Sequence, residues 1–584
     1  MKTLGTIVLA LTLALGGTAA ADVTYYLDAV HGNDTLGNGS AGAPWQSRDR
    51  VLAVVTGGDT VVLASGNYGT FALTATAAGG WDLFDDWVTF IEAPGANARF
   101  ELIRISYTGT PPPDPYQVGF FDAYLRFEGI HVLDGVECFG ARHWALIDCL
   151  VERYGPWTGA FENTRKMAVY FRSGTDILIK GCEITRTGTA VEGRGHDIRV
   201  LNCHIHHGTH DGIRAKGWWH SLIEGNLIHS FDDGVTDEEA DWSSHCDLIH
   251  LYIPLPGIEG MQNRDVIIRN NVLYDTENQI VVLMGCFESD LRNQDIVFEN
   301  NILGPSRATL FNNLDPCDGL VIRNNTVVVF DQPRPFGRWE LENYTLRINE
   351  DSTGVQIYNN ILGTCMIKTG AELLVFDHNL IQVPPDDNPA GVDNTRTFAR
   401  NTLVGVDPMF VDPGAFDGVL DPASPAINFG TRRLAPTPIW EEDIVGTPRD
   451  WRPDLGAWEL PGQIPLRESP PPIHYDVKTT FVDDFADGHY RDVDPWLDGP
   501  RQQGMNWDRP DPVNSKFCVT PSDCFDGSNA LVGPQGDNVS TRQAWLFSEQ
   551  GANWADYDFT FDAVNNYITR GSGVMVLAQD RDNY

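Results

Sequence analysis

Residues 229–250, HSFDDGVTDEEADWSSHCDLIH, combine seven carboxylates with three histidines and contain no Lys or Arg. Carboxylate oxygens are the ligands that hard cations prefer, and His and carboxylate side chains are common proton carriers in enzymes. A run of this composition is a metal site, the edge of a catalytic groove or a solvated loop. The residues around it help to choose between these interpretations.

Basic and aromatic side chains are predicted on the strands beside this acidic run. In GIRAK and LIHLY apolar residues alternate with polar ones, so Arg214, Lys216, His250 and Tyr252 face outward. Stacking of successive coils about 4.8 Å apart aligns such residues in two columns, Tyr170, Glu192, Arg214 and His250, then Arg172, Arg194, Lys216 and Tyr252. A basic strip on a chain of formal net charge -39 suits an anionic ligand.

This strip fits the cleavage of a uronate polysaccharide by β-elimination. The reaction needs the substrate carboxylate neutralised, the C5 proton removed and the leaving oxygen protonated. Lys216 and Arg214 are the candidate bases, because a basic side chain with a lowered pKa can accept a proton. The candidate acid or base partners are His210, His245 and His250.

The acidic run also supplies candidate ligands for Ca²⁺, which would neutralise a uronate. They are Asp232, Asp233, Asp237 and Glu238, and their spacing matches no EF-hand. The candidate substrate-binding residues are Arg194, Trp218, Trp219, Trp242 and Tyr252. A structural alternative stays open for each set, since the acids also suit a solvated loop and the columns also suit Arg–Glu pairing between coils.

A repeated phrase organises most of the chain and is expected to hold these side chains in place. Each copy is a short strand, a polar turn residue, then Asn or Cys and another strand, as in VLNCHI, IRNNVL and FENNIL. The aligned positions are Ile130, Cys149, Cys182, Cys203, Asn226, Asn271, Asn301, Asn325, Asn360 and Asn379. The shortest spacings between them are 19 to 24 residues, which is one coil, and longer spacings contain inserted loops.

These coils predict a right-handed parallel β-helix over residues 22–390. A resemblance further along the chain implies a partial β-sandwich, or jelly roll, after it, so the expected fold is all-β. The repeats resemble the pectin lyase-like superfamily, and YYLDAVHGNDTLGNGSAGAPWQS resembles the N-terminal cap of many secreted bacterial β-helix proteins. The phrase HCDLIH, with His245 and Asp247, resembles an H-x-D-x-I-Q pattern of such proteins and has His250 in place of Gln. The resemblance implies action on polysaccharides.

Two other functions stay open, because this fold also carries hydrolases, epimerases and adhesins. THDG and FDDG lie one coil apart and are similar to the paired acidic motifs of polygalacturonase-like glycoside hydrolases. That similarity implies acid and base roles for Asp211, Asp232 and Asp233 around a water molecule. The later G-H-G and R-I-K motifs of that family are absent. A non-catalytic glycan-binding or adhesive shaft is the remaining interpretation.

Beyond the coils, three further segments are predicted. Residues 391–460 include DIVGTPRDWRPDLGAWE, which resembles a choice-of-anchor region and reads as a C-terminal cap. Residues 461–478 form a Pro-rich linker. Residues 479–584 resemble a laminin G or concanavalin-like β-sandwich that stops before its last strands, so we expect a truncated chain.

The N-terminus and the charge limit location and partners. Residues 1–21 read as a signal peptide cleaved near Ala21, which predicts a secreted, periplasmic or cell-surface protein with no membrane span. The acidic surface argues against nucleic acid, so polysaccharide is the expected partner of a monomer. Three of the ten Cys are expected to stack as a core ladder, whereas Cys286 with Cys317 and Cys518 with Cys524 are candidate disulfides.

Overall fold

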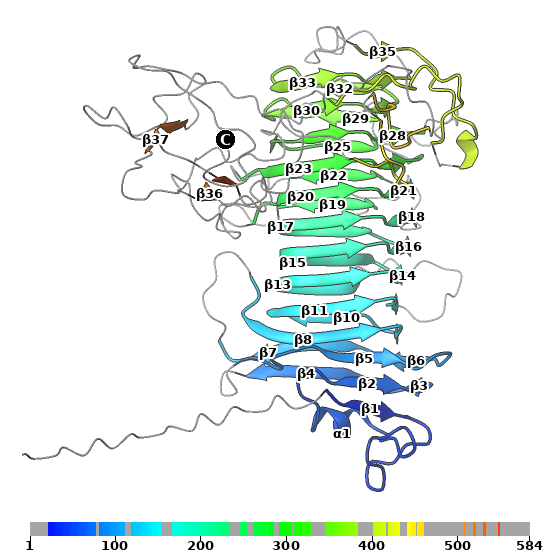
Figure 1. The fold of residues 1–584 in the computed structure, drawn as a ribbon, viewed down its shortest axis with the longest axis vertical. Coiled ribbons are helices and arrows are strands. Elements are labelled where there is room, and N and C mark those ends of the chain that lie inside the picture. The colour runs from blue at the N-terminus through cyan, green and yellow to red at the C-terminus, as the bar shows by residue number, and fades with distance from the viewer. Residues whose placement is uncertain are drawn as a thin grey trace, which may run out of the picture.

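The computed structural model describes residues 22–460 apart from 77–80, 111–117, 154–165, 233–245, 254–260, 277, 285–290, 307–308, 329–344, 383–400, 416–417, 433–440 and 451, together with four short strands between 507 and 548. Residues 22–460 form a stack of coils that rises along the long axis in Figure 1. All strand pairs between coils are parallel, and the pairs form one 22-stranded and one 13-stranded sheet. The predicted right-handed parallel β-helix is therefore confirmed.

Each coil has three faces. The first face consists of β4 (Phe71–Thr76), β7 (Ile103–Thr108), β10 (Val136–Phe139), β19 (Ile249–Tyr252), β22 (Val281–Met284), β25 (Phe311–Asn313), β29 (Leu346–Ile348) and β32 (Cys365–Ile367), together with the N-terminal parts of three long strands. The long strands are β13 (Met167–Lys180), β15 (Thr189–Leu201) and β17 (Ile213–Glu224), which bend from the first face into the second.

The other two faces follow in each coil. The second consists of β1 (Thr24–Leu27), β2 (Thr60–Leu63), β5 (Val88–Glu92), β8 (Phe121–Glu128), β11 (Ala141–Ile147), β20 (Arg264–Arg269), β23 (Asn293–Glu299), β26 (Cys317–Asp318), β27 (Val321–Arg323), β30 (Val355–Tyr358) and β33 (Leu373–Asp377). The third, on the right of Figure 1, consists of β3 (Gly66–Asn67), β6 (Ala98–Phe100), β9 (His131–Val132), β12 (Leu150–Glu152), β14 (Glu183–Thr187), β16 (His204–Gly208), β18 (Leu227–Phe231), β21 (Val272–Thr276), β24 (Ile302–Leu303), β28 (Thr326–Val327), β31 (Ile361–Leu362), β34 (Leu380–Ile381) and β35 (Leu403–Val404).

A ladder of buried side chains joins the coils at the turn between the second and third faces. The buried Asn residues of the repeat bond in series, each amide oxygen accepting from the backbone and the amide of the Asn one coil before, from Asn226 to Asn379. Cys149, Cys182 and Cys203 continue the same position as free, buried thiols. The predicted ladder is thus confirmed.

The left-handed backbone of these turns lies one residue earlier than the ladder. Positive φ angles of 53° to 57° occur at Asn270, Asn300, Asn324 and Asn359, whereas the ladder residues that follow them have none. Asn tolerates the left-handed region because its short side chain bonds locally. Each Asn–Asn pair therefore divides two tasks, since the first Asn makes the turn and the second one joins the coils.

The described chain outside the coils lies near the N-terminus and along the side of the stack. Near the N-terminus, α1 (Arg48–Leu52) is the one α-helix of the described residues, and it starts after Ser47, whose side chain accepts from Arg50 N. Residues 401–460, which include η2 (Pro413–Ala415), contact the side of the stack, because Ala457 N bonds Thr326 Oγ1 and Asn359 Nδ2 bonds the carbonyl of Thr431. Within the segment predicted as a cap, β35 continues the third face beyond residue 390.

Several predictions fall outside the described residues. These are the signal peptide, the linker and nearly all of the sandwich, where two antiparallel pairs are seen, β36 (Trp507–Asp508) with β39 (Phe547–Ser548) and β37 (Cys518–Thr520) with β38 (Ala530–Val532). Cys317 is a free, fully buried thiol, so the structure does not contain the disulfide predicted with Cys286, which is itself not described. No described helix is long and apolar enough to cross a membrane.

Candidate functional site

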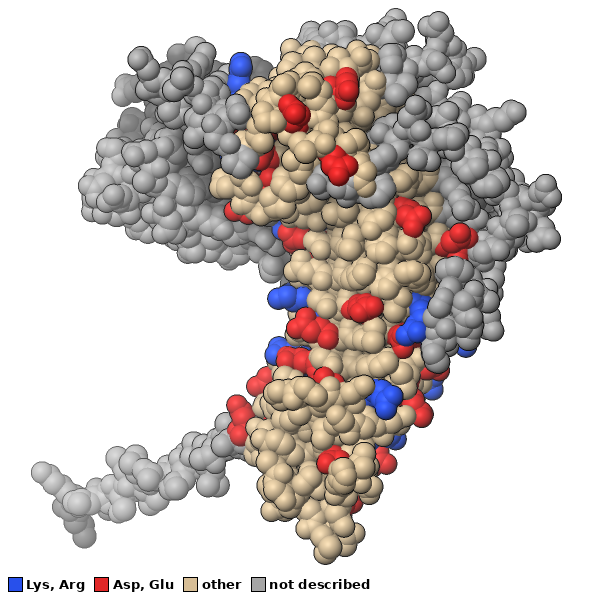
Figure 2. Space-filling view, turned by 90° about the vertical axis from the view of Figure 1, so that its right-hand side faces the viewer, with Lys and Arg blue, Asp and Glu red and all other residues tan. Residues whose placement is uncertain are grey.

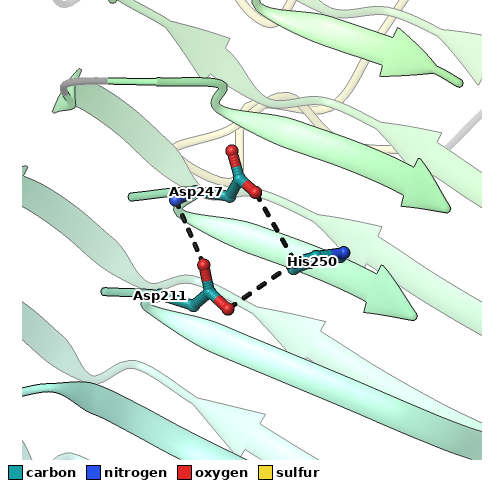
Figure 3. Close-up of side chains that lie close together, drawn as sticks. All are labelled: Asp211, Asp247 and His250. Atoms are coloured by element: carbon teal, nitrogen blue, oxygen red, sulfur yellow. Dashed lines mark hydrogen bonds and ion pairs between the residues drawn. The ribbon is translucent and has the colours of Figure 1, made fainter. Parts of the chain in front are cut away.

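The candidate site lies where the third face turns into the first. Asp211 precedes β17 and Asp247 precedes β19, so the two carboxylates occupy equivalent turns of neighbouring coils. His250 comes from β19 itself, and Figure 3 shows it beside both carboxylates. Residues 233–245 separate β18 from β19 in the sequence, and the bond from Gly212 N to the carbonyl of Asp247 brings Asp247 next to Asp211.

The three side chains form a buried charge cluster. His250 Nδ1 lies 3.6 Å from Asp211 Oδ2 and 3.5 Å from Asp247 Oδ2. Asp211 Oδ1 accepts from the backbone N–H of Asp247 at 3.3 Å, and Asp247 Oδ1 accepts from Gln279 N at 3.1 Å. The exposed fractions of Asp211, Asp247 and His250 are 0%, 3% and 2%, so none of them faces solvent.

Arg214 and His210 also contact the Asp211 carboxylate. Arg214 Nε lies 3.2 Å and His210 Nδ1 lies 3.1 Å from Asp211 Oδ2. A buried carboxylate is tolerated when it is paired and hydrogen-bonded. Asp211 therefore fixes the direction in which the Arg214 guanidinium leaves the strand, and the guanidinium lies over the Tyr252 ring at 5.3 Å from its centroid.

Register confirms the alignment of the first predicted column, but His250 at its end is buried and is not exposed on the surface as predicted. Tyr170 pairs with Glu192, Glu192 with Arg214 and Arg214 with His250 on β13, β15, β17 and β19. In the second column, Lys216 pairs with Tyr252. Arg172 pairs with Phe139 on β10, but the register shifts around Arg172 between β13 and β15 and around Arg194 between β15 and β17. Arg172, Arg194 and Lys216 are therefore not paired with one another.

Lys216 lies in an unusual electrostatic setting. Its Nζ donates to Glu192 Oε1, and its side chain is 21% exposed. Burial is the main reason why the pKa of Lys216 falls below its ordinary value, and Arg214 and Arg194 lower it further. Glu192 opposes them, because its negative charge favours the protonated amine. The sequence predicts Glu192 in the first column but not among the site residues. Its position opposite Arg214 in that column is the feature that could have identified it.

Burial and the proximity of Arg172 also lower the pKa of Arg194. Guanidinium groups that lie near each other repel, and an anion bound beside them would relieve that repulsion. Arg194 is half-buried and Arg172 is exposed, so the pair can be reached from solvent. This part of the strip has the charge that a polymer carboxylate requires.

Two of the three tryptophans predicted to bind substrate, Trp218 and Trp219, lie among the described residues, and their side chains differ in burial. Trp218 is fully buried, stacks on Phe171 at 5.9 Å and donates from Nε1 to the carbonyl of Gly193. The prediction that Trp218 stacks on a sugar is therefore wrong. Trp219 is half-buried on the second face, where it stacks on His196 at 4.7 Å, around the corner from Lys216.

Replacing Trp218 with Phe should lower the free energy of unfolding by about 1–3 kcal/mol, because a smaller ring leaves a cavity and the bond to Gly193 is lost. Glycan binding should not change. Denaturant unfolding and binding isotherms measure the two effects, and Trp219→Phe is the matched surface variant. Loss of binding in Trp218→Phe with unchanged stability would contradict the core assignment.

Five predicted site residues lie outside the described part of the chain. They are Asp233, Asp237, Glu238, Trp242 and His245. Asp232, the remaining predicted Ca²⁺ ligand, is half-buried at the start of the loop, and its N–H bonds the carbonyl of Gly208. The predicted Ca²⁺ site therefore stays a prediction.

A different set of ligand atoms does converge among the described residues. One ligand atom from each of Asp211, Asp247 and His250 lies within 4.8 Å of the others. This mixed oxygen and nitrogen set differs from the oxygen ligands that Ca²⁺ prefers. The Arg214 guanidinium already pairs with Asp211 and His210 contacts it, so the cluster fits a polar network closed by Arg214 better than a Ca²⁺ site.

Comparisons with known proteins agree with the fold. A family model described as right handed beta helix region matches residues 135–362. Pectate lyase Pel9A is 15% identical at a TM-score of 0.40, with 75% of this chain and 97% of that chain covered. PfbA, a surface adhesin of Streptococcus pneumoniae, is 13% identical at a TM-score of 0.34, with 59% and 88% covered. No curated protein matches the sequence.

Proposed function

We propose that this chain is a secreted enzyme that cleaves a uronate-containing polysaccharide by β-elimination, with Lys216 as the base. The observation that carries the proposal is the setting of Lys216, a partly exposed amine whose pKa is lowered by burial and by two neighbouring arginines. A lowered pKa increases the fraction of the amine that is neutral, and a neutral amine can accept a proton from carbon. The same arginines provide positive charge for a uronate carboxylate.

The residues of the strip supply the three requirements of the reaction. Lys216 Nζ takes the C5 proton, and the electron pair of that C–H bond becomes the C4–C5 double bond. The bond from C4 to the leaving oxygen breaks, and its electrons stay on that oxygen. Tyr252, which pairs with Lys216 one coil further, provides a hydroxyl to protonate it. Arg194 and Arg214 neutralise the carboxylate and so favour loss of the C5 proton.

Asp211, Asp247 and His250 act in this proposal as positioning residues. They are buried and so do not touch the polymer, but they set the direction of Arg214. In the hydrolase alternative, Asp211 acts as the acid or base on the sugar. The full burial of Asp211 and its ion pair with Arg214 argue against that role. The partner carboxylate of that alternative, Asp233, lies outside the described residues.

Replacing Glu192 with Gln should move the pH dependence of cleavage to lower pH. The reaction needs neutral Lys216, so the rate rises as pH passes the pKa of the amine. Glu192 raises that pKa, and its loss lowers it. The pH profile of kcat/KM measures the change, with Glu224→Gln on the second face as the control. A shift to higher pH would contradict the assignment of Lys216 as the base.

Calcium is a separate part of the proposal. Asp232, Asp233, Asp237 and Glu238 offer the hard oxygen ligands for Ca²⁺, which would help to neutralise the substrate. Chelator should then reduce cleavage, and added Ca²⁺ should restore it. Cleavage that is unchanged by chelator would remove Ca²⁺ from the proposal and leave the arginines as the neutralising groups.

The test of the function is a screen of the purified chain against uronate-containing and neutral polysaccharides. Ultraviolet absorbance of the unsaturated uronate and new reducing ends are followed together. Both signals rise for a lyase, whereas reducing ends alone identify a hydrolase. Binding of a glycan without either signal supports the adhesive alternative, and no signal and no binding on any glycan would overturn the proposal.

A further inference from the structure

Four histidines gather on the third face, separate from the strip and from the buried carboxylates. His204, His206 and His207 belong to β16, and His229 belongs to β18 of the next coil. His206 pairs in register with His229, and His204 lies two residues before His206, so the alternation of the strand directs both to the same side. This arrangement puts imidazoles from two neighbouring strands on one outer surface.

The imidazole nitrogens approach one another closely. His204 Nε2 lies 2.9 Å from His229 Nε2, and His206 Nδ1 lies 2.5 Å from His207 Nδ1. The ring centroids of His204 and His206 are 4.0 Å apart, and those of His204 and His229 are 5.1 Å apart. The group is therefore a single cluster of nitrogen donors.

Polar side chains surround the cluster on both neighbouring coils. Glu183 Oε1 lies 3.3 Å from His206 Nε2, on the coil before. On the coils after, Ser230 Oγ lies 2.9 Å from His229 Nδ1 and donates to Asp275 Oδ2 at 2.8 Å. Such outer contacts fix the orientation of a histidine ligand and raise its basicity.

The charges nearby do not oppose a bound cation. Figure 2 views the side of the molecule that carries the third face, and it shows acidic groups scattered there and basic groups mainly near its edges. Arg186 is the nearby basic residue, and its guanidinium is engaged by Glu152. Neutral imidazole is the form that coordinates metals.

We propose that His204, His206 and His229 form a binding site for a divalent transition metal ion of the Zn²⁺ class. Two histidines at alternate positions of one strand and one histidine on its neighbour provide three nitrogen donors on one face. Zn²⁺ accepts such a set, with a fourth position left for water or another ligand. Histidine nitrogen also suits Cu²⁺ and Ni²⁺, whereas Ca²⁺ and Mg²⁺ prefer oxygen.

The nitrogens of His204, His206 and His229 do not yet converge as the ligand atoms of Asp211, Asp247 and His250 do, because the His206 and His229 rings stack with centroids 5.5 Å apart. The geometry therefore needs an adjustment to receive the ion. Zn–N bonds of about 2.0–2.1 Å place tetrahedral ligand nitrogens about 3.3–3.4 Å apart, close to the 2.9 Å between His204 and His229. His206 directs its nitrogens to His207 and Glu183, so its ring must turn towards the other two. The backbone positions stay in place, because β16 and β18 are held in register by the coil stack.

Zn²⁺ binding at this site can be tested independently of the lyase proposal. The untagged chain is titrated with Zn²⁺ by calorimetry, and Ca²⁺ and Mg²⁺ serve as comparison ions. About one equivalent of Zn²⁺ should bind, and the thermal midpoint should rise with Zn²⁺ concentration, because a ligand that binds the folded state stabilises it. His206→Gln and His229→Gln should each weaken binding by more than about 100-fold, since loss of an outer partner alone costs about 10- to 100-fold.

Two variants make the outcome decisive. His220→Asn changes a half-buried histidine of β17 at a φ of 48°, which Asn tolerates, and should bind Zn²⁺ as the parent chain does. Asp211→Asn removes the other group of possible ligands and should also leave Zn²⁺ binding unchanged. Circular dichroism confirms that each variant is folded.

The proposal is overturned if the parent chain binds no Zn²⁺, or if both histidine variants bind it as well as the parent does. In that case the cluster is a set of N–H···N contacts with no metal. It is equally overturned if Asp211→Asn abolishes binding, because the ion then belongs to the carboxylate cluster. Neither result changes the outcome of the polysaccharide screen, so the two proposals fail separately.

Discussion

Replacing Lys216 with Met is expected to reduce cleavage of the polysaccharide by about 10³-fold or more. A positioned general base contributes about 10²- to 10⁴-fold, and Met keeps the length of the side chain without the amine. Lys216 is the one lysine of the predicted column of Arg172, Arg194, Lys216 and Tyr252. Its partner on β19 is Tyr252, so no second amine in this column can replace it. The loss should appear mainly in kcat, since Arg194 and Arg214 still bind the substrate carboxylate.

The control for this result is Lys180→Met. Lys180 is an exposed residue at the end of β13 on the second face, so its loss removes the same charge from the chain without touching the strip. Initial rates of absorbance at saturating substrate measure the effect, and the thermal midpoint shows whether Glu192 tolerates the loss of its partner. Retention of more than a tenth of the activity in a folded Lys216→Met chain would exclude Lys216 as the base.

The basic strip around Arg214 and Lys216 can be predicted from the sequence because alternating apolar residues in a strand indicate which side chains face the core. Ile213 and Ala215 are fully buried, so Arg214 and Lys216 must face outward. A shift of one residue would expose the apolar set, which fixes the register between coils. For that reason the column from Tyr170 to His250 could be assigned before any coordinates.

The same rule fails at the corner of the coil. Continued alternation after Lys216 would direct Trp218 outward, but Gly217 has a φ of 76° and the strand bends there. The bend changes the phase of the alternation, so Trp218 enters the core and its ring packs on Phe171. Corners of this kind depend on how the coils before and after are placed, and a local pattern does not contain that information.

The buried cluster is also beyond local reasoning. Asp211 and Asp247 lie far apart in the sequence, and the pairing of their two coils, which includes the bond from Gly212 N to the carbonyl of Asp247, brings the two turns together. The phrase HCDLIH identifies Asp247 and His250 as unusual residues. It does not say that they are buried, and burial is what changes their role from contact with substrate to positioning of Arg214.

The Asn ladder is where a single substitution should cost the most stability. The side chain of Asn301 donates to the carbonyl of Ile268 and to Asn325 Oδ1, and its oxygen accepts from the backbone and the amide of Asn271. Asn301→Ala removes these bonds and leaves donors of Asn271 buried, each at a cost of about 1–3 kcal/mol. We expect the free energy of unfolding to fall by about 3–5 kcal/mol, summed over these groups.

The matched comparison is Asn379→Ala at the last described rung of the ladder. Asn379 accepts from Asn360 and donates to the carbonyl of Ile357, so it makes fewer coil-to-coil bonds than Asn301. Its replacement should lower the free energy of unfolding by less, and urea unfolding followed by circular dichroism measures the effect of both substitutions.

Hydrogen exchange shows where the Asn301 variant is weakened. Because neighbouring coils stabilise one another, this variant should unfold first in the middle of the stack, where hydrogen exchange of Asn271 and its neighbours should rise. Equal effects of the two substitutions would mean that the bonds of the ladder contribute little and that the apolar core alone sets the stability of the coils.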